Sequence, residues 1–241
     1  MNSIKSYMYK SKQFNDVASR LFNNNYKIDH YATRSFFIKS IIKDLKCNNY
    51  ELEGEEFHIK ENIESRWMSN NDKILNPISN KLERADFPYV FLTNVNVVPL
   101  DSMLQSDIEP YEELLKYVKN PRSMTYSYYQ NLIKENHILA WTMLFKNQIN
   151  HLAFQVDDIE ECLDCVKNTL PEYEINNPNN PIEVSEDQNL KQFSLKAEST
   201  VFHFADEIRD VPYTFVEFVQ RSNGRRGFET KNAQGIFEST K

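Results

Sequence analysis

Two histidines and one glutamate are the residues of this chain whose types and settings best suit metal chemistry. His30 lies in IDHYATRSF and His151 in INHLAFQVDD, and each follows an isoleucine and a short polar residue. Glu217 lies in YTFVEFVQR, where a charge interrupts an apolar strand pattern. A buried carboxylate is costly unless an opposite charge compensates it. A divalent metal ion would do so, and two imidazoles with one carboxylate are the facial triad of non-haem iron(II) sites.

Each of these residues also has a plainer interpretation. A strand histidine is usually a core or surface residue, and a strand glutamate is more often paired with a basic side chain, here Arg34, Arg84 or Arg221. His203, in VFHFAD, is the substitute ligand that the sequence leaves open, whereas His58 lies among charged residues. The matching settings of the two histidines favour the metal site.

Arg34 is a candidate for substrate binding because it lies four residues after His30. On a strand with side chains that alternate between faces, Ile28, His30, Ala32 and Arg34 would share one face. A guanidinium there could bind a substrate carboxylate through two parallel hydrogen bonds. The alternatives are a salt bridge to Glu217 and a surface position.

The apolar pattern predicts two similar units that would position these residues. They cover about 26–98 and 149–221, and each begins with the histidine-bearing strand, continues with a helix and ends with several strands. A mostly helical insert at about 101–147 separates them, and 222–241 form a C-terminal segment. We therefore expect a single metal-binding domain over 1–241, of the α+β class, in which the paired units form one curved, mixed sheet around a metal cavity.

Individual elements follow from periodicity, capping residues and β-branched or aromatic content. An N-terminal helix should end in an Asn-rich turn at 23–25. The predicted strands are 26–37, 50–59, 63–68, 89–98, 150–156, 192–197, 200–204 and 213–221, and the predicted later helices are 36–45, 108–118, 126–145 and 159–170.

Composition excludes several classes of function. The net charge of -7 disfavours nucleic-acid binding, and the four glycines form no phosphate-binding loop. No apolar run is long enough for a membrane span, and the N-terminus lacks the apolar core of a secretory signal. Cys162 and Cys165 form a lone C-x-x-C on an apolar helix face, which favours core packing over zinc binding. An odd cysteine count without a signal favours the cytoplasm.

Four stretches together resemble the 2-oxoadipate dioxygenase/decarboxylase family: DHYATRSF, NHLAFQVDDIE, YTFVEFVQR and the tail GFETKNAQGIFEST. This family belongs to the vicinal oxygen chelate (glyoxalase/extradiol dioxygenase) superfamily, and the resemblance extends from His30 to Thr240. It implies that His30, His151 and Glu217 are the metal ligands and that Arg34 binds the substrate carboxylate. By the same resemblance, the segment KQFSLKA places Gln192 and Ser194 at the substrate site.

The resemblance also implies an activity. Fe(II), or another divalent metal, would bind a 2-oxo dicarboxylic acid such as 2-oxoadipate and react with dioxygen, giving CO2 and 2-hydroxyglutarate in lysine catabolism. The insert is more compact than in the family, which leaves the identity of the 2-oxo acid open. The alternatives are a lyase, isomerase or hydrolase that uses another metal on the same scaffold, and a protein that binds a small ligand without metal. The oligomeric state does not follow from the sequence.

Overall fold

The computed structural model describes residues 11–36, 38–58, 63–70, 73–75, 82–84, 89–95, 109–146 and 148–228. Its helices are α2 (Lys12–Asp16), the π-helical turn η1 (Val17–Leu21), α3 (Ile38–Cys47), α4 (Glu109–Lys119), the 3-10 turn η3 (Pro121–Ser123), α5 (Tyr126–Phe145) and α6 (Ile159–Thr169). Its strands are β1 (Lys27–Ser35), β2 (Glu51–His58), β3 (Ile63–Ser69), β4 (Lys73–Leu75), β5 (Leu82–Arg84), β6 (Tyr89–Val95), β7 (Ile149–Gln155), β8 (Glu183–Val184), β9 (Leu190–Ser194), β10 (Glu198–His203) and β11 (Ile208–Arg221).

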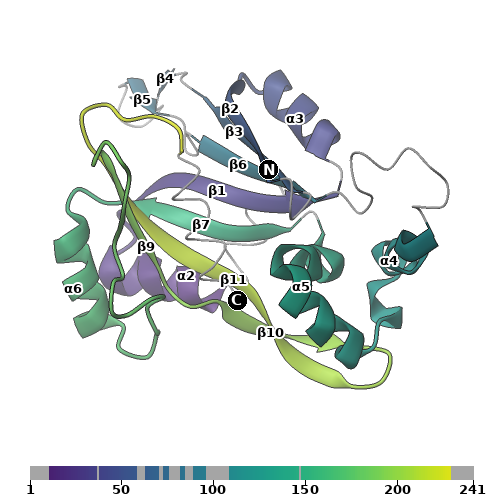
Figure 1. Cartoon of the computed structure of the whole chain (residues 1–241). Coiled ribbons are helices and arrows are strands. Elements are labelled where there is room, and N and C mark those ends of the chain that lie inside the picture. Colours follow the sequence, from purple (N-terminus) through teal and green to yellow (C-terminus); the bar gives the residue numbers. More distant parts are fainter. Residues whose placement is uncertain are drawn as a thin grey trace.

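The central feature is one curved, mixed sheet in which the two predicted units lie side by side (Figure 1). The strand order is β2-β3-β6-β1-β7-β11-β9-β8, and β10 pairs separately with β11. In each unit the first strand pairs in parallel with the last long strand, β1 with β6 and β7 with β11. The two first strands meet in the middle as an antiparallel pair. The predicted fold class and the repeated strand–helix order are confirmed.

Two irregularities interrupt the pairing of β1 with β7, one before each candidate histidine. The register passes from Ile28↔Phe154 to His30↔Ala153 and thus skips Asp29. It later passes from Ala32↔His151 to Thr33↔Ile149 and skips Asn150. Such bulges change the direction of side chains and occur often beside active sites.

The bulge at Asp29 explains why one prediction from the sequence, that Ile28 shares a face with His30, is wrong. Ile28 does not share a face with His30, because it packs on the opposite face with Phe154 and Val216. Strict alternation fails where the strand carries an extra residue. We call the face with His30, His151 and Glu217 the ligand face, and the opposite one the helix face.

Helices α2 and α6 cover the helix face of the second unit. α6 begins at its predicted cap, since the Asp158 carboxylate accepts a hydrogen bond from the Glu161 backbone at 2.9 Å. Cys162 packs in the core cluster there as expected, whereas Cys165 is exposed, contrary to the prediction. The Asn-rich turn before β1 is confirmed, with Asn23 and Asn24 in the left-handed region that asparagine tolerates. Helix α3 covers the helix face of the first unit.

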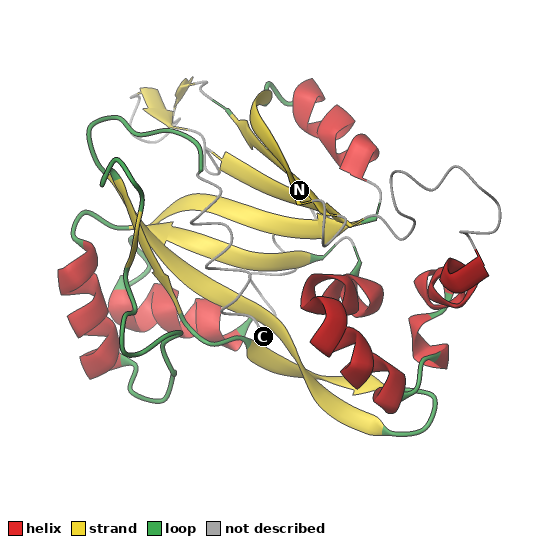
Figure 2. Ribbon diagram, in the orientation of Figure 1, coloured by secondary structure: helices red, strands yellow, loops and turns green. Residues whose placement is uncertain are grey.

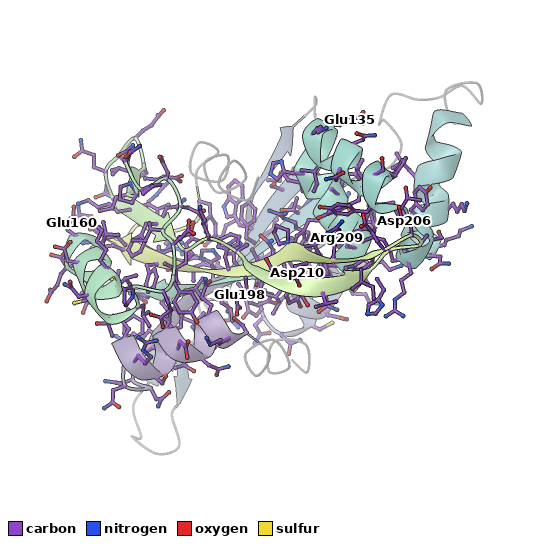
Figure 3. The ribbon with its side chains drawn as sticks, turned by 90° about the horizontal axis from the view of Figure 1, so that it is seen from below. Glu135, Glu160, Glu198, Asp206, Arg209 and Asp210 are labelled. Carbon is purple, nitrogen blue, oxygen red and sulfur yellow. The ribbon has the colours of Figure 1, made fainter. Side chains whose placement is uncertain are left out.

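The helical insert packs against the ligand face (Figure 2). Helix α5 changes direction at Asn136, whose backbone is not helical and whose side chain caps the Leu139 backbone at 2.9 Å. The hairpin of β10 and β11 contacts the start of α5, where the Asp206 carboxylate accepts a hydrogen bond from the Tyr126 backbone at 2.9 Å. Figure 3 shows Asp206 and Arg209 at this end of the hairpin. The insert is thus attached to the strand that carries Glu217.

Short strands β4, β5 and β8 were not expected, because two or three residues are too few for a periodic pattern. The predicted tail motif lies largely outside the described residues, as do residues 96–108 between β6 and the insert. Among the residues that the structure describes, no helix is long and apolar enough to cross a membrane.

Gly54 on β2 is required by packing, because a Cβ atom there would lie 2.2 Å from the Trp67 ring. That ring stacks on Phe91 at 6.3 Å between centroids. We expect Gly54→Ala to lower the free energy of unfolding by about 1–3 kcal/mol, the usual cost of overpacking. Chemical denaturation would measure it, with Leu52→Ala on the exposed part of the same strand as the control. A Gly54→Ala variant as stable as the wild type would contradict the close packing.

Candidate metal centre

Three neighbouring strands bring His30, His151 and Glu217 together. β1, β7 and β11 are adjacent in the sheet, and Glu217 pairs with Ala153, two residues after His151. The three side chains are almost completely buried, with 1%, 4% and 0% of their residues' surface exposed, respectively. They form the group of potential metal ligands found among the described residues. The structure thus brings together the three residues that the sequence singles out as candidate metal ligands.

The ligand atoms have the spacing that a small divalent ion requires. The two Nε2 atoms are 3.2 Å apart, and each lies 3.3 Å from Oε2 of Glu217. Ligands at about 2.0–2.2 Å from an ion lie roughly 3.0–3.5 Å from one another in octahedral or tetrahedral geometry. All three donors lie on one side of such an ion, which leaves its other positions open.

The surroundings of the Glu217 carboxylate also suit a metal ion, because its described ion pairs are with the two histidines alone. Both carboxylate oxygens are buried, and neither accepts a hydrogen bond from the described residues. Arg221 pairs instead with Asp29, which removes one of the arginines that could have neutralised Glu217. A carboxylate in this setting needs a cation, and the donor set suits a divalent metal.

The two residues in the bulges hold the imidazole rings. His30 donates from Nδ1 to the Asp29 carboxylate at 2.8 Å, and His151 donates from Nδ1 to the Asn150 side-chain oxygen at 3.1 Å. Each ring therefore presents Nε2 to the metal position. The sequence places a short polar residue before each histidine, but its pattern alone indicates no function for Asp29 or Asn150. Their shared place before a histidine was the available signal.

The electrostatics of the two rings differ. Burial lowers the pKa of His151 well below its usual value, and the nearby charges of His30 and Arg34 add to this effect. Burial also disfavours the charged form of His30, but the Asp29 and Glu217 carboxylates outweigh it and raise the pKa. Although burial opposes ionisation of Asp29, Arg221 and His30 hold its pKa far below the usual range.

Arg34 is buried on the ligand face, with 2% of its surface exposed, so the predicted surface alternative is wrong. Its guanidinium carbon lies 5.3 Å from the centroid of the Trp141 ring in helix α5. Burial lowers the pKa of Arg34 to about 9. The Trp141 indole N–H donates to the Tyr213 carbonyl at 2.5 Å, which ties this helix to β11. The arginine thus has a fixed stacking surface near the histidines.

Gln192 and Ser194 lie on β9 beside the strand of Glu217. Ser194 pairs directly with Glu217 in the antiparallel register, and Gln192 with Val219. Residues that face each other in an antiparallel pair project to the same side, so both predicted residues lie on the ligand face. Ser194 accepts a hydrogen bond from Asn176 at 2.8 Å, and Gln192 donates to Glu183 at 3.1 Å.

Aromatic rings surround the candidate ligands. Phe215 stacks on His151 at 4.6 Å between centroids, and Phe228 meets His30 edge-on at 4.8 Å. Phe91 occupies the position in the first unit that corresponds to Glu217, because it pairs with Ala32, two residues after His30. The substitute ligand His203 is exposed on β10 and outside the group. The site thus takes ligands from both units but a carboxylate from one alone.

Comparisons with known proteins identify similar sequences and folds. Residues 109–224 match the sequence model of the 2-oxoadipate dioxygenase/decarboxylase family. This segment contains His151 and Glu217, whereas His30 and Arg34 precede it. Over 187 residues the chain is 27% identical to the chloroplastic 2-oxoadipate dioxygenase/decarboxylase of Arabidopsis thaliana, which covers 64% of this chain and 50% of that relative. The chain therefore spans about half the length of this relative.

Solved structures share the fold over most of the chain. The hydroxyglutarate synthase of Oryza sativa in complex with 2-oxoadipate has a TM-score of 0.78 at 22% identity, covering 99% of this chain and 89% of that one. A protein assigned to the glyoxalase superfamily from Ralstonia eutropha JMP134 has a TM-score of 0.61 at 18% identity, covering 93% and 78%. The chain therefore shares the fold of these proteins. Its residues 109–224 are similar in sequence to the 2-oxoadipate dioxygenase/decarboxylase family, which is the family that its motifs resemble.

Proposed function

We propose that this protein is an Fe(II)-dependent dioxygenase/decarboxylase that converts a 2-oxo dicarboxylic acid, such as 2-oxoadipate, to a 2-hydroxy acid and CO2. The observation that carries the proposal is the buried group of two Nε2 atoms and one carboxylate oxygen, mutually 3.2–3.3 Å apart. This group lies in a chain whose second half matches the family model. For 2-oxoadipate the product is 2-hydroxyglutarate.

The ligand residues supply geometry and leave room for exchangeable ligands. His30, His151 and Glu217 hold the metal from one side. Bound Fe(II) supplies open coordination positions and the redox chemistry that dioxygen needs. The rings of Phe215 and Phe228 pack against the histidines and keep bulk water from this side of the site.

The substrate proposal depends on Arg34. His30, His151 and Glu217 would hold the metal that takes the 2-oxo acid end of a dicarboxylic substrate, and Arg34 would bind its distal carboxylate. The burial of this arginine beside Trp141 supports the assignment, because a buried guanidinium gains most from an anionic partner. Gln192 and Ser194 contribute polar groups at the substrate site from β9. The Oryza structure with 2-oxoadipate supports the same ligand class.

Metal binding is tested first. We expect His151→Ala to weaken divalent-metal affinity by more than the roughly 10- to 100-fold that outer-shell changes cost, because one of three protein ligands is lost. Metal titration of the apoprotein, followed by elemental analysis, would measure it. His203→Ala is the matched control and should bind metal as the wild type does. Equal loss in both variants, or tight binding of a small ligand by metal-free protein, would contradict the proposed centre.

Turnover tests the activity itself. Protein reconstituted with Fe(II) without air and then given 2-oxoadipate and oxygen should consume oxygen and release CO2 in equal amounts. An oxygen electrode and mass spectrometry of the 2-hydroxy acid would follow the reaction. A fully loaded protein that turns over no dicarboxylic 2-oxo acid would refute the oxygenase assignment. Native protein that contains zinc, nickel or manganese would instead favour a lyase, isomerase or hydrolase.

Arg34→Ala should weaken 2-oxoadipate binding by about 10- to 150-fold, since hydrogen bonds to charged groups contribute roughly 1.5–3 kcal/mol. Metal affinity should stay unchanged. The matched ligand is 2-oxohexanoate, which has the same chain length without the distal carboxylate, and its weaker binding should not depend on Arg34. Calorimetry on the metal-loaded protein without oxygen would compare the two acids. A similar loss for both would show that Arg34 does not bind the distal carboxylate.

A further inference from the structure

A buried ion pair lies directly behind one of the two candidate histidine ligands. Asp29 is fully buried, and its carboxylate accepts hydrogen bonds from Nε of Arg221 at 2.7 Å and from Nη2 at 2.9 Å. The same carboxylate accepts the Nδ1 proton of His30 at 2.8 Å. Asp29 thus joins a ligand histidine on β1 to an arginine at the end of β11.

Arg221 itself is held on several sides. Its Nη1 donates to the Gly227 carbonyl at 2.6 Å. Its guanidinium carbon lies 4.4 Å from the Tyr89 ring centroid and 5.1 Å from that of Phe228. A planar guanidinium fixed between two rings and a carbonyl has little freedom to leave Asp29. The chain holds this pair rigidly although the pair contributes no metal ligand.

The corresponding position in the second unit is neutral. Asn150 occupies the other bulge and accepts the Nδ1 proton of His151 at 3.1 Å. A charged acceptor makes a stronger hydrogen bond than a neutral one and raises the basicity of the opposite ring nitrogen. His30 is therefore the stronger electron donor of the two histidines.

We propose that Asp29 and Arg221 form a positioning pair that orients His30 for metal binding and sets the charge of the centre. Asp29 holds the ring and strengthens its Nε2 as a donor. Arg221 cancels the charge of Asp29, so a divalent ion with Glu217 keeps one net positive charge for an anionic ligand. This inference rests on the metal-binding part of the proposed function and not on the oxygenase activity.

The first test is Asp29→Asn in the full chain, because asparagine keeps the shape and the acceptor oxygen. Cobalt(II) titration of the apoprotein should show roughly 10- to 100-fold weaker binding, the range for residues behind a ligand histidine. Glu198→Gln is the matched control: this carboxylate also accepts two hydrogen bonds, from Ser11 and the Gln13 backbone, but lies outside the metal group. It should leave the cobalt affinity unchanged.

Proton NMR of the cobalt-loaded protein separates positioning from general destabilisation. Paramagnetic cobalt(II) shifts the NMR signals of the exchangeable Nδ1 protons of its two histidine ligands away from the other protein signals. Asp29→Asn should change the chemical shift of the His30 Nδ1 proton, and Asn150→Ala should change that of the His151 Nδ1 proton. If both signals keep their positions in Asp29→Asn, the pair is merely structural.

Arg221 variants test the charge argument. Arg221→Met should destabilise the apoprotein strongly, because it leaves the Asp29 carboxylate buried without its cation. Adding Asp29→Asn to this variant should restore thermal stability but not the wild-type cobalt affinity, and Arg221→Lys should retain part of both. Wild-type affinity in Asp29→Asn would overturn this inference alone. Wild-type protein that binds no divalent metal would overturn both this inference and the proposed metal centre.

Discussion

The burial of one carboxylate in the middle of a sheet is the constraint on which the arrangement depends. Glu217 is completely buried on a strand whose neighbouring residues belong to the hydrophobic core. Water cannot solvate it there, and its described ion pairs are with two histidines. Each imidazole ring must therefore face the Glu217 carboxylate with Nε2. This orientation requires a hydrogen-bond acceptor for Nδ1 on the other side of the ring. The bulges and the buried ion pair follow from this requirement, because they provide the acceptors.

The pairing of two similar units explains how residues so distant in sequence meet. The first strands of the units lie next to each other, so their histidines converge without any long side chain having to reach across. β11 lies beside β7 and adds Glu217 in register with it. Helix α5 then covers part of the same face and brings Trp141 to Arg34. The insert thus contacts the arginine that we propose as the substrate-binding residue, whereas the sheet alone positions the three candidate metal ligands.

Most of this arrangement could be predicted from the sequence. Periodicity and capping residues indicated the long strands and helices, and the matching settings of His30 and His151 indicated the shared site. The two bulges could not be predicted, because an extra strand residue leaves no periodic signal and becomes visible only in the pairing register. For that reason the prediction that Ile28 shares a face with His30 was wrong, and the hydrogen bonds of Asp29 and Asn150 to the histidines were missed. The Asp29–Arg221 pair was missed because its residues are 192 positions apart.

The unequal contribution of the two units has a further consequence at Phe91. A doubled scaffold could offer four donors, one from each first strand and one from each last strand. Phe91 stands where the fourth would be, and its ring packs against Phe228 at 5.2 Å. The last strands of the two units therefore differ at this position: β11 of the second unit carries a carboxylate, and β6 of the first unit carries an aromatic ring. A metal ion held by His30, His151 and Glu217 would thus meet an aromatic ring, and not a fourth protein ligand, at this position of the first unit.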